Sequence, residues 1–91
     1  MTIVWTLQAI DDLQHVRRFI AETNPRAATV VAQRLIEAVE RLADFPASGR
    51  SGRLPDTREL VVARTPFIVP YRIVRAEIQI IAVIHAARRW P

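Results

Sequence analysis

The chain of 91 residues contains no cysteine, no lysine and only two glycines. The absence of cysteine excludes disulfide bonds, thiol nucleophiles and thiolate metal sites. The absence of lysine excludes a Schiff-base lysine and the lysine of a phosphate-binding P-loop. Apolar runs stay far below the roughly 18–20 residues that a membrane-spanning helix requires, so we expect no membrane association.

Length and composition indicate one globular domain over residues 1–91, without a linker or an internal repeat. Hydrophobic residues make up 51% of the chain and charged residues 24%, which is typical of a packed core rather than of disorder. The N-terminal stretch 1–13 lacks the basic segment and cleavage site of a signal peptide. We therefore expect an intracellular, cytoplasmic protein.

All 13 basic residues are arginine, and they are unevenly distributed. Residues 1–45 carry five arginines and six acidic residues, whereas residues 46–91 carry eight arginines and three acidic residues. The second half is therefore basic, with a net charge of +5. A basic half of this kind suggests an acidic partner, either nucleic acid or a protein rich in aspartate and glutamate.

The first half of the chain predicts two amphipathic helices joined by almost no loop. Thr6 has the chemistry of an N-cap, and the first helix is expected to end near Thr23. Asn24 followed by Pro25 predicts a second start, because proline at the first helical position loses no needed N–H bond. The second helix continues to about Phe45, so the pair must form a hairpin or meet at a sharp angle. The apolar face of the first helix contains Ala9, Leu13, Val16 and Ile20.

The second half predicts strands. Residues 45–57 contain both glycines and form a loop. Pro70 predicts an irregularity, since proline within a sheet is confined to edges or bulges. With a short β-prone stretch at 2–5, the order is β-α-α-β-β-β, an α+β domain with a helical hairpin on one face of a small antiparallel sheet. The strands after the loop are expected at 58–64, 67–74 and 78–86.

Six short motifs follow one another along the chain and together resemble a known family. They are A-x-x-D-L (9–13), F-I-A-x-x-N-P-x-A-A (19–28), P-x-x-G-R-x-G-R (46–53), T-R-E-L (57–60), P-F-I-V-x-Y-R (66–72) and V-I-H-A-A-R-R-W-P (83–91). In this order they resemble the RelE/ParE superfamily of toxins from bacterial type II toxin–antitoxin modules. Within that superfamily the ParE-like branch is more similar.

The resemblance implies a partner and a target as well as a fold. Such toxins are held inactive by a cognate antitoxin, whose flexible C-terminal segment wraps the toxin surface. ParE-like members typically poison DNA gyrase, and RelE-like members cleave mRNA, usually on the ribosome. A third possibility is a family member that has lost toxicity and only binds its antitoxin. One scaffold carries all of these activities, so the fold alone does not choose between them.

The residues needed for metal-free RNA cleavage are present in the sequence. His85 is the natural general base or acid, and Glu59 is an alternative base. Arg58, Arg72 and Arg88 could hold phosphate, and Tyr71 could donate a proton or stack on a base. The RelE pattern, however, includes several lysines and a C-terminal tyrosine, whereas this chain has no lysine and its only tyrosine is Tyr71. We therefore expect no catalytic residues and favour a protein that acts by binding.

Binding residues are predicted in two groups. Arginine and tryptophan dominate the energetics of many interfaces, so the ending H-A-A-R-R-W-P is the predicted target-binding segment, through His85, Arg88, Arg89 and Trp90. Trp90 could be an exposed anchor, or it could fold back over the sheet. The predicted antitoxin-binding arginines are Arg50, Arg53, Arg58 and Arg72. Two histidines without cysteine or an acidic cluster supply too few ligands for a catalytic metal, so we expect no metal and no cofactor.

Overall fold

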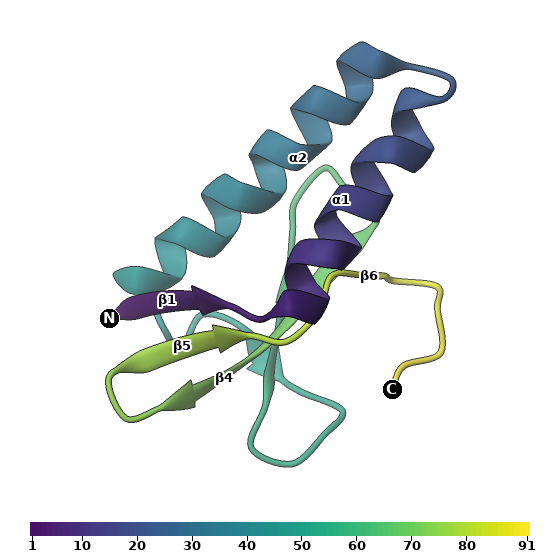
Figure 1. Ribbon diagram of the computed structural model, residues 1–91. Coiled ribbons are helices and arrows are strands. Elements are labelled where there is room, and N and C mark those ends of the chain that lie inside the picture. The colour runs from purple at the N-terminus through teal and green to yellow at the C-terminus, as the bar shows by residue number, and fades with distance from the viewer.

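The computed structural model describes residues 1–91 and places two helices across one face of a six-stranded sheet (Figure 1). This arrangement confirms the expected α+β class. A short 3-10 turn, η1 (Arg41–Ala43), follows the second helix. The elements in chain order are β1 (Thr2–Trp5), α1 (Leu7–Ala21), α2 (Pro25–Glu40), β2 (Arg50–Ser51), β3 (Arg58–Val61), β4 (Phe67–Val74), β5 (Glu77–Ile80) and β6 (Ile84–His85).

The sheet has the order β1-β5-β4-β3-β2, with β6 also paired to β4. β1 lies beside β5 and runs parallel to it, whereas all other pairs are antiparallel (Figure 1). The sheet is therefore mixed, which corrects the expectation of a wholly antiparallel one. The physical reason is that both helices and strands β2 to β4 separate β1 from β5 in the chain, so no short turn forces this pair to be antiparallel.

Both helices begin where the capping residues predict. The Thr6 hydroxyl accepts the Ala9 N–H at 3.2 Å, and the Asn24 side chain accepts the Ala27 N–H at 3.0 Å. Pro25 is the first residue of α2. These local hydrogen bonds satisfy N–H groups that have no partner inside the helix. No helix is long and apolar enough to cross a membrane.

The predicted strand 78–86 is interrupted opposite Pro70. Tyr71 pairs with Ile80 and Ile68 pairs with Ile84, so three residues, 81–83, lie opposite only two on β4. The Pro70 carbonyl accepts the Ile81 N–H at 2.9 Å, so the proline nitrogen, which has no hydrogen to donate, also faces this segment. The irregularity predicted at Pro70 is therefore a β-bulge.

Asp12 on α1 supports the bulge. Its Oδ2 accepts the Val83 N–H at 3.0 Å, and its Oδ1 accepts the Gln8 side chain at 2.7 Å. Val83 is buried, and its N–H has no partner in the sheet because the chain bulges there. The carboxylate of α1 thus links the helical layer to the segment that leads into β6.

Replacement of Asp12 by alanine is expected to lower the free energy of unfolding by about 1–3 kcal/mol, because it leaves the Val83 N–H without an acceptor. Asp12→Asn should lose much less, since its amide oxygen still accepts. Urea denaturation followed by circular dichroism measures the difference. Asp11→Ala, at the exposed neighbouring position, is the matched control. Equal stability of Asp12→Ala and Asp11→Ala would show that the carboxylate does not hold the bulge.

The sheet carries apolar clusters on both faces. The main core, which includes Leu35, Val39, Tyr71 and Ile80, lies between the helices and the sheet. On β4 the alternation of side chains places Ile68 on the other face. There it forms a smaller cluster with Ala82 and Ile84, against which Ile81 and Trp90 pack.

Candidate functional site

A buried glutamate organises the arginines of the 46–57 loop. Glu59 is 1% exposed and accepts from Arg50 Nη2 at 3.2 Å and from the Arg53 backbone N–H at 2.9 Å. The Arg53 Nε lies 3.5 Å from the same carboxylate. Burial of a carboxylate is costly unless cations and hydrogen bonds surround it, and here both of its oxygens have partners. Glu59 therefore acts as the anchor of the loop.

The other face of the sheet fixes the start of the same loop. The Tyr71 side chain is fully buried, and its hydroxyl donates to the Pro46 carbonyl at 2.7 Å and accepts the Gly49 N–H at 2.9 Å. Arg58 donates to the Ala47 and Gly49 carbonyls at 3.2 and 2.9 Å. Both side chains are thus engaged with the loop backbone. Of the four predicted antitoxin-binding arginines, only Arg72 has an exposed side chain without a hydrogen bond in the protein.

His85 lies in a shallow hollow between α1 and the C-terminal segment. Its ring meets Phe67 edge to face, with centroids 5.7 Å apart, and its Nδ1 accepts the Ala87 N–H at 3.0 Å. The hollow has an apolar floor and is also lined by Arg88 and by residues of α1, namely Asp12, His15, Val16 and Phe19. His85 therefore faces the helical side of the sheet with its Nε2 unengaged by the protein.

The C-terminal segment 86–91 runs outward from β6 and then turns back toward the sheet (Figure 1). Arg88 and Arg89 are exposed, whereas Trp90 is half-buried against the Ile68, Ala82 and Ile84 cluster. Of the two alternatives left open for Trp90, the structure has the indole folded over the sheet. The guanidinium of Arg53 donates to the carbonyls of Arg88 and Trp90 at 3.4 and 3.5 Å.

The residues proposed for RNA cleavage do not converge. Glu59 pairs with Pro70 and lies on the sheet face away from the helices, whereas His85 pairs with Phe67 and lies on the helical face. Tyr71 is buried with its hydroxyl fully engaged. A general base and a general acid must both reach one reacting phosphate, and these side chains offer no such common point. No group of three histidine, aspartate or glutamate side chains is placed to share a metal ion.

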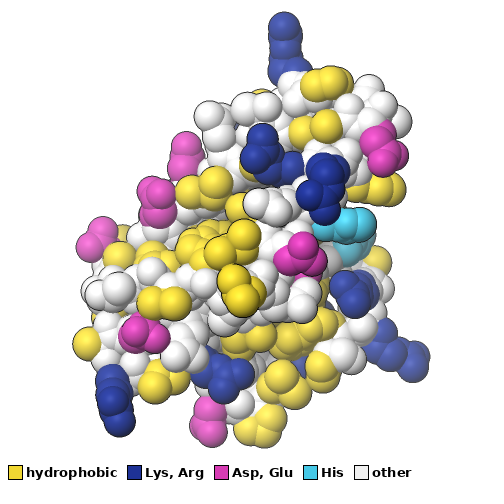
Figure 2. Space-filling view, in the orientation of Figure 1, with side chains coloured by type: hydrophobic (Ala, Val, Ile, Leu, Met, Phe, Trp, Pro, Cys, Tyr) yellow, Lys and Arg dark blue, Asp and Glu magenta, His cyan; other side chains and the backbone are white.

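The helices carry several large apolar side chains that are exposed to solvent and lie outside the apolar faces buried against the sheet. Leu7 is 86% exposed and Phe19 is 68% exposed, and Ile10 and Ile36 lie over the junction of the two helices. Figure 2 shows hydrophobic side chains gathered near the middle of one face, with charged side chains around them. Such patches on a small monomer indicate a surface that binds another protein.

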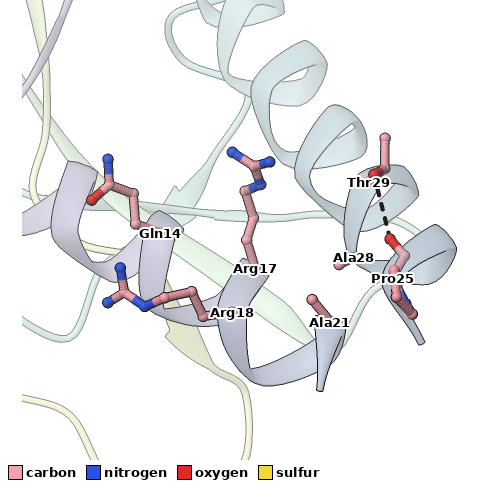
Figure 3. Close-up of a pocket in the computed structure, with 7 residues that line it drawn as sticks. All are labelled: Gln14, Arg17, Arg18, Ala21, Pro25, Ala28 and Thr29. Carbon is pink, nitrogen blue, oxygen red and sulfur yellow. Dashed lines mark hydrogen bonds between the residues drawn. The ribbon is translucent and has the colours of Figure 1, made fainter. Parts of the chain in front are cut away.

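A second groove lies where α1 ends and α2 begins (Figure 3). Its floor is formed by small residues, and Arg17 and Arg18 point in different directions from its α1 side. Thr29 donates to the Pro25 carbonyl at 3.4 Å and so uses its hydroxyl within α2. The groove therefore brings no acid, base or nucleophile together, and its chemistry is that of a contact surface.

The family model for the ParE toxin of type II toxin–antitoxin systems, parDE, matches residues 3–90. The chain belongs to the ParE toxin family. The resemblance noted from the sequence motifs is therefore confirmed.

Two relatives and one solved structure support membership of the RelE/ParE toxin superfamily. Y4kP of Sinorhizobium fredii, described as a candidate toxin, is 47% identical over 89 residues, which is 98% of this chain and 92% of the relative. Toxin RelE2 of Caulobacter vibrioides is 37% identical over 86 residues, 94% of this chain and 96% of the relative. A structure of the chromosomal ParDE TA system from P. aeruginosa is 30% identical, with a TM-score of 0.86, and the match covers 93% of this chain and 95% of that chain.

Sequence reasoning missed two contacts, one made by Asp12 and one made by Arg53. The role of Asp12 depends on a bulge whose unpaired N–H only the folded sheet reveals. The contact of Arg53 with the C-terminal segment joins residues 35 and 37 positions apart. The sequence contains one signal for the Arg53 contact. Residues 46–91 hold eight arginines and only three acidic residues, so Glu59 has several possible arginine partners and the sequence does not choose among them.

Proposed function

We propose that this ParE-family toxin acts in the cytoplasm by binding DNA gyrase, and that a cognate antitoxin neutralises it. The observation that carries the proposal is the C-terminal segment, which presents Arg88 and Arg89 to solvent. Exposed arginines beside an ordered aromatic ring are well suited to an interface with a protein–DNA complex. His85 and Trp90 border the same segment and belong to the proposed target-binding surface.

Two of the polar side chains considered for RNA cleavage, Tyr71 and Glu59, already form hydrogen bonds inside the protein, which favours binding over catalysis. The Tyr71 hydroxyl and both oxygens of Glu59 are already satisfied inside the protein. An enzyme that cleaves RNA without a metal needs a base, an acid and cations around one phosphate. His85 beside Arg88 is the part of the surface that could serve such a reaction. RNA cleavage is therefore the second candidate.

The antitoxin is proposed to contact both layers of the domain. The exposed apolar residues of α1, above all Leu7 and Phe19, offer area for an amphipathic partner segment. The side chain of Arg50 is 55% exposed despite its ion pair, so it and Arg72 can also bind acidic side chains of the partner. Arg53 and Arg58 belong to the same proposed surface, with Arg58 acting through the loop carbonyls that it holds. A net charge of +4 at pH 7 favours an acidic partner.

Expression of the chain without its antitoxin, from a tightly repressed promoter, tests this proposal. DNA and protein synthesis are pulse-labelled separately during the first minutes of induction. Gyrase poisoning predicts an early stop in DNA synthesis with an SOS response, and His85→Ala should lower toxicity less than loss of Arg88 and Arg89, because His85 lies at the border of the proposed surface. RNA cleavage predicts an early stop in protein synthesis instead. It also predicts that His85→Ala lowers the activity about 10²- to 10⁴-fold, the usual contribution of a general acid or base.

A further inference from the structure

The segment that carries Arg88 and Arg89 is held to the domain at very few points. β6 ends at His85, and the Ala86 and Arg88 N–H groups bond to the carbonyls of Pro66 and His85. Beyond these bonds, the only hydrogen bonds to residues 88–91 come from the guanidinium of Arg53, which reaches the carbonyls of Arg88 and Trp90. The Trp90 indole also packs against the Ile68, Ala82 and Ile84 cluster.

Arg53 is itself fixed by Glu59. The carboxylate accepts the Arg53 backbone N–H at 2.9 Å and lies 3.5 Å from its Nε. The Nη1 of the same guanidinium is directed at the segment. A planar guanidinium can contact a carboxylate on one side and carbonyls on the other, which a lysine ammonium on a flexible stem cannot reproduce.

We propose that Glu59 and Arg53 are positioning residues that hold the C-terminal segment 88–91 in the geometry required for target binding. The inference deepens the proposed function and rests on it. Neither residue needs to touch the target. Glu59 fixes Arg53 from within the protein, and Arg53 fixes the backbone on which Arg88 and Arg89 are displayed.

The fluorescence of Trp90 directly measures whether the C-terminal segment 88–91 stays packed against the domain. In a Trp5→Phe background Trp90 is the only tryptophan, and acrylamide quenching reports how exposed it is. Arg53→Ala and Arg53→Lys should shift its emission to longer wavelength, and the ratio of held to released segment should fall roughly 10-fold. Glu59→Gln should act in the same direction. Circular dichroism verifies that each variant is folded.

Arg50→Ala is the matched control. Arg50 also pairs with Glu59, but it makes no hydrogen bond to the C-terminal segment. A role of Glu59 restricted to general stability would make Arg50→Ala and Arg53→Ala equivalent in Trp90 quenching and in toxicity. Our inference requires that the Arg53 variants and Glu59→Gln expose Trp90 and that Arg50→Ala does not. Unchanged Trp90 quenching in folded Arg53→Ala would overturn it.

Combination with a truncation separates this inference from the proposed function. If Arg53 acts through the segment, Arg53→Ala should add nothing to the loss of gyrase affinity caused by removal of residues 88–91, because coupled residues are not additive. Full additivity would overturn the positioning role. Truncation without any loss of toxicity would overturn the proposed function, whereas Trp90 quenching in the full-length chain would still establish whether Arg53 holds the segment.

Discussion

Truncation after Ala87 is expected to abolish toxicity while the fold is retained. The four deleted residues lie outside every helix and strand and outside the main core. They include both exposed arginines of the proposed target-binding surface. Arginine and tryptophan anchors at interfaces each contribute about 2 kcal/mol or more, so the loss of two anchors predicts target binding weaker by about 10³-fold. Viable counts after induction without antitoxin measure the effect.

Two variants separate surface charge from packing in this result. Arg88→Ala with Arg89→Ala keeps Trp90 over its apolar cluster and should still lose most of the toxicity. Arg17→Ala with Arg18→Ala removes the same charge from exposed positions on α1 and should remain toxic. If the α1 variant were as harmless as the truncation, the effect would come from overall charge and the C-terminal segment would have no special role.

Replacement of Tyr71 by alanine is expected to destabilise the protein by about 3–5 kcal/mol, the usual cost of deleting a buried aromatic side chain. The ring is fully buried, and its hydroxyl bridges Pro46 and Gly49, which fixes the loop to the sheet. Tyr71→Phe should cost about 1–3 kcal/mol, because it leaves the part-buried Pro46 carbonyl and the buried Gly49 N–H without this partner. Urea denaturation of the purified variants measures both values.

Gly49→Ala tests the same contact from the loop side. A Cβ at this position would lie 2.6 Å from the Tyr71 hydroxyl oxygen, so the loop or the ring must move, and we expect a loss of stability comparable to that of Tyr71→Phe. Because Tyr71 is assigned a structural role, folded Tyr71→Phe should remain toxic. A Tyr71→Phe variant that is as stable as the parent and yet harmless would instead place the hydroxyl in the chemistry of the toxin.

Local features of the fold could be predicted because they depend on neighbouring residues. Thr6, Asn24 and Pro25 define helix starts through side-chain chemistry within three positions, and the structure confirms each. The strand 67–74 and the irregularity at Pro70 were also predicted correctly. The parallel placement of β1 was not, because the order β-α-α-β-β-β is compatible with either edge and either direction of that strand.

The residue types of the candidate site could be predicted from the sequence, but their burial and contacts could not. The sequence places several arginines near Glu59, and both Arg50 and Arg53 form ion pairs with it. It could not indicate that Tyr71 is fully buried. Alternation along a strand shows which face of the sheet a side chain lies on, but not how completely other elements cover that face. Nor could it decide between an exposed and a packed Trp90, because the cluster that receives the indole is assembled from β4, β6 and the bulge between them.

The most direct test of the central claim is a cleavage assay with purified DNA gyrase and supercoiled plasmid. The full chain, freed from its antitoxin, should cause gyrase–DNA cleavage complexes to accumulate as linear plasmid after protease treatment, and the Arg88→Ala/Arg89→Ala variant should not. Absence of any effect of the full chain on gyrase, combined with cleavage of mRNA on purified ribosomes, would contradict the account.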